Sequence, residues 1–356
     1  MESTPSHRLR IIDANINRIG EGLRVLEEFA RLSLNDAALT ARLKDMRHKI
    51  LHVDADLQQR LIGARNAAGD VGAGMTAAGD EERRDPSETI IANARRVQES
   101  LRVLEEVAKE PEAGLESKEY EKARFELYTI EKELLSKMLR QEKVKRLAGL
   151  YVIVDVESLK GRSALDVAEE AIRGGAKVLQ LRDKGSNRRS FFDIALEMRK
   201  LCKQNEILFI VNDSLEVALA VDADGLNVGQ EDLPVAEARR LLPIDTLIGA
   251  SASSIKEAKA AQAAGADYLG VGAIYPTPSK HDVSVVGLEL IRRIKKAANM
   301  PIVAIGGINK GNISAVMKAG ADAAAVISAV MGADDTRKAT RQLVDIIKGE
   351  KRGQSG

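Results

Sequence analysis

From about residue 147 onward the chain alternates short apolar strands with helical segments, and this alternation limits the possible folds more than any other feature. Eight strands are predicted to begin near Leu150, Val178, Ile207, Gly225, Thr246, Tyr268, Ile302 and Ala323. Helical patterns follow them at 164–173, 190–203, 215–220, 234–241, 255–264, 288–298, 312–318 and 337–348. Eight strand–helix units in roughly 200 residues predict an α/β fold, a (β/α)8 TIM barrel. A doubly wound open sheet is the alternative, but no Gly-x-Gly-x-x-Gly follows the first strand.

Residues 10–145 have an almost wholly helical pattern. Ile12, Ile16 and Ile19 begin an apolar stripe with steps of three and four residues, which is typical of an amphipathic helix. A second helix is predicted to start at Asp85 as cap, with Pro86 in its first position. We therefore expect an all-α domain over residues 1–147, followed by the barrel over residues 148–356.

The two N-terminal helices repeat each other 78 positions apart. The recurring polar residues are Asn15, Arg18 and Glu21, matched by Asn93, Arg96 and Glu99. Such a repeat predicts a duplicated helical unit with approximate two-fold symmetry. Residues three apart lie on one side of a helix, so each set is either part of a binding site or a salt-bridged surface.

A glycine-rich segment, residues 69–75, lies between the two helices and contains the carboxylate of Asp70. It could cradle phosphate through backbone N–H groups, but it lacks the Lys-Ser/Thr of a P-loop. A mobile connection is the alternative.

The composition narrows the class of partner. A net charge of +1 gives no global attraction to nucleic acid or a membrane surface, and aromatic residues make up only 3%. The single cysteine, Cys202, excludes an intrachain disulfide and fits a reducing compartment. Neither the first ten residues nor any later segment is apolar enough for a signal peptide or a membrane span. We expect a cytoplasmic protein with small-molecule substrates, and the sequence is compatible with a homo-oligomer.

Chemistry in a barrel of this kind is expected where strands end and βα loops begin. In the second strand, alternation places Gln180, Arg182 and Lys184 on one face and Leu179 and Leu181 on the other. A row of polar, anion-compatible side chains suits an anion receptor. A solvated face on an edge strand is the alternative.

Two aspartates follow neighbouring strands. Asn212-Asp213 ends the third strand, and Asp232 follows the fourth. With no histidine or cysteine cluster nearby, the two carboxylates suit Mg²⁺ completed by water and phosphate oxygens. Helix N-capping is the alternative for both.

The loops after strands seven and eight contain Gly306-Gly307 and Ile327-Ser328. Barrels commonly bind a phosphate there through backbone N–H groups. With the positive charges of Arg182, Lys184 and Lys280, these loops predict two phosphate-bearing ligands that meet over magnesium.

The same inventory contains no convincing nucleophile or general base. Cys202 lies within a helical pattern, and His281 has no evident acidic orienter. Stabilisation of a leaving group therefore fits better than covalent catalysis.

Taken in order, these motifs resemble the thiamine phosphate synthase family over essentially everything after residue 147. They are Gln180-x-Arg182-x-Lys184, Asn212-Asp213, Gly229-Gln230-Glu231-Asp232, Gly249-x-Ser251, Tyr275-Pro276-Thr277-x-Ser279-Lys280, Ile305-Gly306-Gly307-Ile308 and Ile327-Ser328. The resemblance implies that hydroxymethylpyrimidine diphosphate and hydroxyethylthiazole phosphate condense to thiamine phosphate and pyrophosphate by Mg²⁺-assisted dissociative substitution.

The resemblance also implies residue roles. The pyrimidine diphosphate would be bound by Gln180, Arg182, Lys184 and Asn212, and Mg²⁺ by Asp213 and Asp232. Ser251, Lys280 and Lys184 would be catalytic, with Ser251 and Lys280 on the departing pyrophosphate. The thiazole phosphate would be bound by Thr277, Ser279, Gly307, Ile327 and Ser328.

The N-terminal half resembles a helical domain fused to some bacterial thiamine phosphate synthases and associated with hydroxymethylpyrimidine phosphate kinase activity. The matching motifs are Asp13-Ala14-Asn15-x-Asn17-Arg18, Glu21-Gly22-Leu23-Arg24-Val25-Leu26-Glu27, Asp70-Val71-Gly72 and Asn93-x-x-Arg96-x-x-Glu99-x-Leu101-Arg102. This resemblance implies that the domain makes the diphosphate with ATP and Mg²⁺. Its candidate site residues are Asn15, Arg18, Glu21, Asp70, Asn93, Arg96 and Glu99.

Other classes of function stay open. The helical half could be a non-catalytic dimerisation or regulatory module. The barrel could be a regulator that binds thiazole phosphate without catalysis, but the intact Asp213, Asp232 and Lys184 argue against it. It could also be a thiazole tautomerase with a histidine base, but Lys280 stands where that histidine would be.

Overall fold

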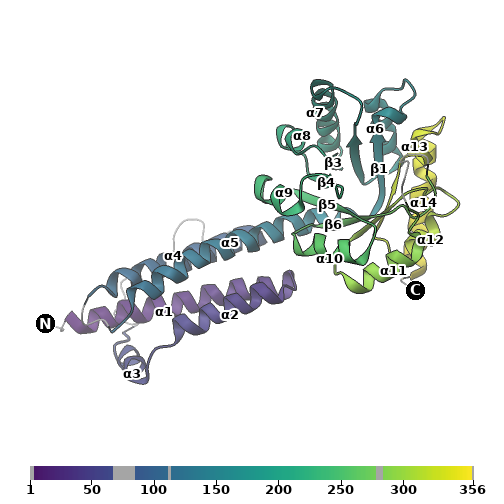
Figure 1. The fold of residues 1–356 in the computed structure, drawn as a ribbon. Helices are drawn as coiled ribbons and strands as arrows, with labels where there is room; N and C mark the ends of the chain where they lie inside the picture. The colour runs from purple at the N-terminus through teal and green to yellow at the C-terminus, as the bar shows by residue number, and fades with distance from the viewer. Residues whose placement is uncertain (1–3, 67–84, 111–113, 278–283, 355–356) are drawn as a thin grey trace. The chain divides into compact units, whose positions relative to one another are not determined.

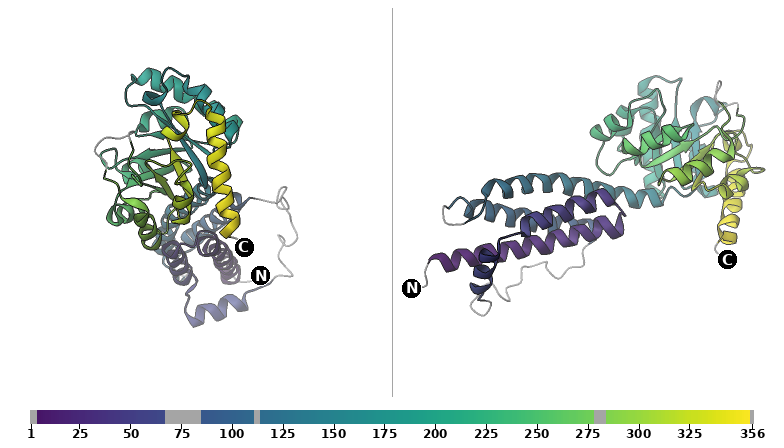
Figure 2. Two further views of the ribbon diagram at one scale, coloured as in Figure 1. Left: turned by 90° about the vertical axis from the view of Figure 1, so that its right-hand side faces the viewer. Right: turned by 60° about the horizontal axis from the view of Figure 1, so that its bottom comes forward.

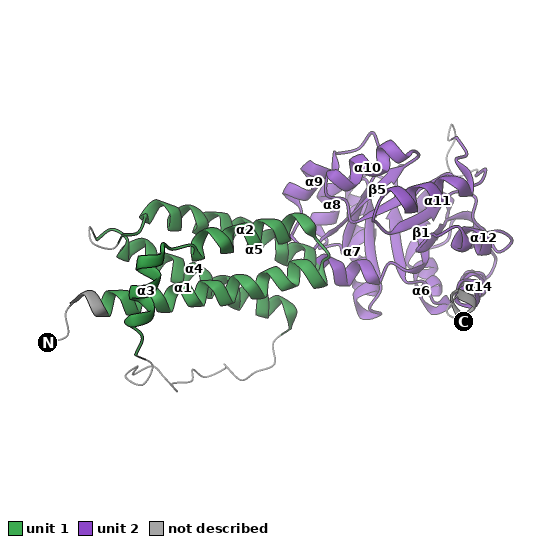
Figure 3. Cartoon of the chain, turned by 90° about the horizontal axis from the view of Figure 1, so that it is seen from below, with its two compact units in different colours: residues 1–139 green, residues 140–356 purple. Residues whose placement is uncertain are grey.

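The computed structural model describes residues 4–66, 85–110, 114–277 and 284–354 of the chain. They belong to two compact units, Met1–Leu139 and Arg140–Gly356 (Figure 3). No helix in these ranges is both long and apolar enough to cross a membrane.

The first unit is all helical, as predicted, and its long helices run side by side as a bundle (Figures 1 and 2). Its elements are α1 (Thr4–Glu28), a π-helix (Phe29–Ser33), α2 (Ala37–Leu51), α3 (Ala55–Gly63), α4 (Pro86–Val107) and α5 (Ser117–Lys145). Asp85 caps α4, since its side chain accepts a hydrogen bond from the N–H of Glu88 at 2.9 Å. Buried apolar side chains from all five α-helices form one core.

The sequence repeat coincides with the pairing of α1 and α4. Equivalent apolar positions of the two helices are buried: Ile12 and Ile90, Ile19 and Val97, Leu23 and Leu101, and Leu26 and Leu104. A Cβ atom on Gly22 would lie 2.4 Å from Cγ2 of Val97, so the helices touch at this point.

Lys137 of α5 ties together two carboxylates of the bundle. Its Nζ lies 2.6 Å from Asp36 Oδ2 and 2.8 Å from Glu133 Oε1. Burial raises the pKa of both carboxyls, but their hydrogen bonds, chiefly those from Lys137, outweigh it and leave each pKa below its usual value. This cluster therefore stabilises the fold at neutral pH.

Helix α5 ends at Lys145, just before the boundary predicted at residue 147, whereas the two units divide within α5, after Leu139. The last turns of α5 pair with the barrel. Arg140 Nε lies 2.8 Å from Asp267 Oδ1, and Lys143 Nζ lies 2.8 Å from Asp245 Oδ2.

The second unit is a closed barrel of eight parallel strands in chain order, which confirms the predicted (β/α)8 fold. The strands are β1 (Gly149–Asp155), β2 (Val178–Arg182), β3 (Leu208–Asn212), β4 (Gly225–Val228), β5 (Leu247–Ala252), β6 (Tyr268–Val271), β7 (Ile302–Ile305) and β8 (Ala323–Val326). The helices are a 3₁₀ turn (Val156–Ser158), α6 (Ala164–Gly174), α7 (Arg188–Gln204), α8 (Leu215–Ala220), α9 (Val235–Leu241), α10 (Ile255–Ala263), α11 (Gly287–Ala297), α12 (Ile313–Lys318), α13 (Ser328–Met331) and α14 (Thr336–Gln354). Each strand begins within one residue of its predicted start.

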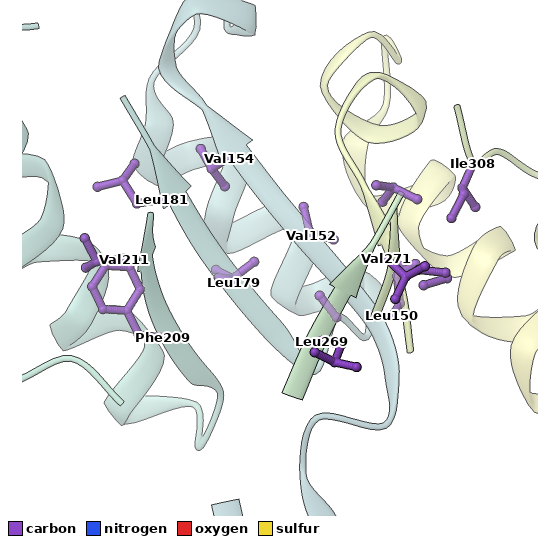
Figure 4. Close-up of a cluster of buried hydrophobic side chains, with 14 of the residues drawn as sticks. Leu150, Val152, Val154, Leu179, Leu181, Phe209, Val211, Leu269, Val271 and Ile308 are labelled. Atoms are coloured by element: carbon purple, nitrogen blue, oxygen red, sulfur yellow. The ribbon is translucent and has the colours of Figure 1, made fainter. Parts of the chain in front are cut away.

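Alternation along the strands gives the barrel an outer and an inner core. Leu179 and Leu181 of β2 lie in the outer core, which contains Val152 and Val154 of β1 (Figure 4). Inside the barrel a separate apolar cluster closes the end where the strands begin. The opposite end carries polar side chains among apolar ones and holds the candidate site.

Candidate active site

A cavity of about 200 Å³ lies at the carboxyl ends of the strands. Because all strands of a parallel barrel end at one rim, residues far apart in the chain meet there. The predicted site residues among its lining are Gln180, Arg182, Lys184, Asn212, Asp213, Asp232, Ser251, Thr277, Gly307, Ile327 and Ser328. Two further candidates, Ser279 and Lys280, lie outside the described residues.

The polar row of β2 faces this cavity. Gln180 is buried, and its Nε2 lies 3.4 Å from Oδ1 of Asn212 on β3. Lys184 follows the strand, and its Nζ lies 3.6 Å from Asp213 Oδ2. The alternative of an edge strand is wrong, because β2 pairs with both β1 and β3.

Arg182 is held by a carboxylate to which the sequence analysis gave no role. Asp155 ends β1 and lies opposite Arg182 in the strand register. Its Oδ2 accepts hydrogen bonds from Arg182 Nη1 at 2.9 Å and from Ser158 Oγ at 3.1 Å. Asp155 is only 2% exposed, and its Oδ1 has no hydrogen-bond partner among the described residues. The sequence did contain one indication of such a role, because Asp155 is an acidic residue at the end of the first predicted strand.

Asp213 and Asp232 form a carboxylate pair. Burial raises the pKa of Asp213 to about 6, and the adjacent Asp232 adds to this shift while Lys184 opposes it. Neither aspartate caps the helix that follows, because α8 begins after Ser214 and α9 after Pro234, with no side-chain cap. Asp232 instead accepts a hydrogen bond from the N–H of Gly229 at 2.7 Å.

This donor set fits a hard cation in part. Two oxygen-bearing carboxylates share the cavity, and a bound cation would relieve their repulsion. Within the described ranges no three His, Cys, Asp or Glu side chains are grouped as a complete metal site. Any Mg²⁺ would therefore need water and substrate oxygens as further ligands.

The loop after β7 provides backbone groups rather than side chains. Gly306 and Gly307 have φ values of 100° and 64°, and a Cβ on Gly307 would lie 2.4 Å from the carbonyl oxygen of Pro276. Only glycine fits such a position without strain. Asn309 and Asn312 donate side-chain hydrogen bonds to the Gly307 carbonyl at 3.2 and 3.0 Å, which fixes the loop.

No histidine or cysteine is among the described residues that line the cavity. Cys202 is buried in α7, and burial raises the pKa of its thiol to about 12, so it is not a nucleophile. His281 lies outside the described residues. The sequence analysis also missed Asn227 of β4, a half-buried amide that lines the cavity. The sequence indication for Asn227 was that it is a polar residue within a short, otherwise apolar strand.

Most of the candidate site residues of the helical unit line one groove. Asn15, Arg18 and Glu21 of α1 line a groove of about 510 Å³ together with Arg96 and Glu99 of α4. The other two candidates, Asn93 and Asp70, are not part of this lining, and Asp70 lies outside the described residues.

Comparisons with known proteins show which families the chain resembles. Residues 150–330 match the family described as thiamine monophosphate synthase, and residues 10–133 match the ThiD2 family. The thiamine-phosphate synthase of Synechocystis sp. is 39% identical over 96% of this chain and 97% of its own length. The enzyme of the same name from Thermosynechococcus vestitus is 38% identical over 94% of this chain and 93% of its own. A solved thiamine phosphate pyrophosphorylase from Pyrococcus furiosus is 44% identical with a TM-score of 0.54, over 58% of this chain and 98% of that one.

Proposed function

The chain belongs to the thiamine phosphate synthase family of transferases, and we propose that its barrel joins hydroxymethylpyrimidine diphosphate to hydroxyethylthiazole phosphate. The bond between the pyrimidine methylene carbon and the diphosphate oxygen breaks, and its electron pair leaves with pyrophosphate. The thiazole nitrogen then donates its lone pair to the pyrimidine methylene cation. The products are thiamine phosphate and pyrophosphate.

One observation carries this proposal. A single cavity brings together a cationic row, a carboxylate pair and a glycine loop, and no histidine or cysteine is among its described lining residues. A dissociative substitution needs a stabilised leaving group and no strong base. A tautomerase with a histidine base fits this lining less well.

The residues divide between the two substrates. Arg182, Lys184 and Ser251 would bind the diphosphate and stabilise its charge as it departs, with Lys280 as a further cation. Gln180 and Asn212 would orient the pyrimidine. The thiazole phosphate would be bound by Thr277, Ser279, Gly307, Ile327 and Ser328.

Asp213 and Asp232 would hold Mg²⁺, because hard carboxylate oxygens suit this ion and because a bound cation would lower the pKa of Asp213, which burial raises. The ion would neutralise negative charge on the diphosphate oxygens. Lys184, whose Nζ lies 3.6 Å from Asp213 Oδ2, would keep this carboxylate oxygen oriented.

The test is Asp213→Ala in the full-length chain. We expect loss of Mg²⁺-dependent product formation with an unchanged thermal unfolding midpoint. Asp345→Ala, at an exposed carboxylate on α14, is the matched control and should keep full activity. Near-normal turnover of Asp213→Ala at saturating Mg²⁺ would refute the metal assignment.

For the helical unit we propose the preceding step, phosphorylation of hydroxymethylpyrimidine monophosphate by ATP with Mg²⁺. The match of residues 10–133 to the ThiD2 family supports this step. The proposed site comprises Asn15, Arg18, Glu21, Asp70, Asn93, Arg96 and Glu99. Incubating the full chain with the monophosphate, ATP, Mg²⁺ and thiazole phosphate should give thiamine phosphate. Product from preformed diphosphate alone would leave the helical unit a structural or regulatory module.

A further inference from the structure

One side of α5 carries a pair of aromatic side chains that the helical bundle does not cover. Phe125 is 57% exposed and Tyr128 is 43% exposed, and no other aromatic side chain among the described residues is exposed. Their ring centroids lie 6.0 Å apart with an interplanar angle of 72°, which is an edge-to-face contact. Single exposed apolar residues are ordinary, but adjoining aromatic rings beside an arginine are the composition typical of a protein interface.

Arg124 holds the two rings in place. Its guanidinium carbon lies 4.9 Å from the ring centroid of Phe125 and 6.0 Å from that of Tyr128. Arg124 is itself anchored to the bundle, because its Nη2 lies 3.0 Å from Oε2 of the buried Glu105 on α4. Side chains that are already ordered lose little conformational freedom when they bind a partner, so this arrangement favours association.

The aromatic pair belongs to a longer stripe on α5 whose positions are three and four residues apart in alternation. The members of this stripe are Lys118, Glu121, Phe125, Tyr128, Lys132 and Leu135. The first five are exposed, whereas Leu135 is half-buried and is not part of the apolar core of the bundle. Such spacing aligns side chains in one row along a helix, which is the pattern by which two helices pack against each other.

Two opposite charges flank the aromatic pair and are not used in the fold. Neither Glu121 nor Lys132 has an ion pair or hydrogen bond within the part of the chain that the structure describes. Lys137 of the same helix, in contrast, pairs with two carboxylates of the bundle. The charges of Glu121 and Lys132 are therefore available to a partner.

The order of these residues makes the stripe complementary to itself. Glu121 lies four residues before Phe125, and Lys132 lies four residues after Tyr128. When a second copy of α5 runs in the opposite direction, each Glu121 therefore faces a Lys132 and each Phe125 faces a Tyr128. One sequence supplies both halves of such a contact, as the two-fold interface of a homodimer requires.

We infer that α5 pairs with α5 of a second copy of this chain in antiparallel orientation. The aromatic rings form the centre of the interface, and two Glu121–Lys132 ion pairs lie on either side of it. Lys118 then lies against Leu135 of the other copy, which its apolar stem can cover. A single pair of helices is a small interface, so the dimer should depend on protein concentration. This inference does not depend on either of the proposed activities.

The test is sedimentation velocity of the full-length chain over a range of concentrations. We expect the wild type to approach twice the monomer mass as the concentration rises. Glu121→Lys places like charges in both ion pairs and should raise the dissociation constant of the dimer at least about tenfold. The double variant Glu121→Lys/Lys132→Glu restores opposite charges, so its dissociation constant should return toward that of the wild type.

The matched control is Glu126→Lys, which makes the same change of charge at an exposed glutamate of α5 outside the stripe and should leave the dissociation constant unchanged. Phe125→Ser removes one ring of the central pair and should also weaken the dimer at least about tenfold. Thermal unfolding checks that each variant is folded.

Three results would overturn the inference. The first is a wild type that stays monomeric at every concentration up to about 100 µM, because a homodimer of any useful affinity would form there. The second is a dimer that both Glu121→Lys and Phe125→Ser leave intact, because it would use another surface. The third is a dimer that Glu121→Lys weakens and the double variant does not restore, because Glu121 would then not face Lys132 of the second copy.

Discussion

Replacing Asp155 by asparagine removes one charge while nearly preserving the shape of the side chain. At 2.9 Å, the attraction between Asp155 and Arg182 amounts to about 4–6 kcal/mol at an effective dielectric constant of about 20. Asparagine keeps an acceptor, and the desolvation of the carboxylate is relieved, so we expect a net destabilisation of about 1–3 kcal/mol. Removal of the charge also leaves Arg182, whose side chain is only 16% exposed, without its main anchor.

The substitution should weaken binding of the pyrimidine diphosphate more than binding of thiazole phosphate. Arg182 lines the cavity, and an unanchored guanidinium must be ordered when the diphosphate binds. We expect the KM for the pyrimidine diphosphate to rise roughly tenfold or more, with the KM for thiazole phosphate nearly unchanged. Urea unfolding and steady-state kinetics with each substrate varied in turn measure the two effects.

Glu157 supplies the matched control. Its Oε2 lies 3.9 Å from Arg182 Nη1, but its side chain is 55% exposed, so solvent screens the pair. Glu157→Gln should leave stability and both KM values close to those of the wild type. If Asp155→Asn behaves like Glu157→Gln, the reasoning that the buried carboxylate positions Arg182 is refuted.

Three further changes test other parts of the structure. Gly249→Ala would place a Cβ 2.1 Å from the buried ring of Tyr268, so we expect a loss of about 1–3 kcal/mol in urea unfolding; a wild-type midpoint would contradict the packing of the barrel interior. Asn312→Ala removes one of two amides on the Gly307 carbonyl and should raise the KM for thiazole phosphate roughly fivefold, the value of one neutral hydrogen bond, without affecting the pyrimidine substrate. Lys137→Met removes the cation that lowers the pKa of both its carboxylate partners, so the stability difference from the wild type should be full above about pH 5 and should shrink as the pH falls below about 4; a gap independent of pH would show that the charges contribute nothing.

The barrel, and the grouping of most candidate site residues around one cavity, could be predicted because both depend on local sequence order. Each strand and the residues just after it are adjacent in the chain, and the closed parallel topology then brings every strand end to one rim. Gln180, Asn212 and Ser251 reach the cavity for this reason alone.

The role of Asp155 could not be predicted in this way, because it depends on the register between two strands. Its partner, Arg182, is set by the register between β1 and β2, which pairs these two residues side by side. A one-residue shift in that register would turn Asp155 toward a different neighbour. Strand starts were predicted to within one residue, and such precision suffices for the fold but not for a side-chain pair.

The helical repeat shows the same limit more sharply. Arg18 and Arg24 lie on the same helix, recur in the same register, and are both exposed. In sequence the two are equivalent candidates for a site or for a salt bridge. The structure distinguishes them, because the glutamate that pairs with Arg24 also binds a residue from a third helix. Arg47 from α2 pairs with Glu27, and Arg124 from α5 pairs with Glu105, the counterpart of Glu27. Because those partners come from helices outside the repeat, only the assembled bundle distinguishes charges that hold it together from charges left available to a ligand.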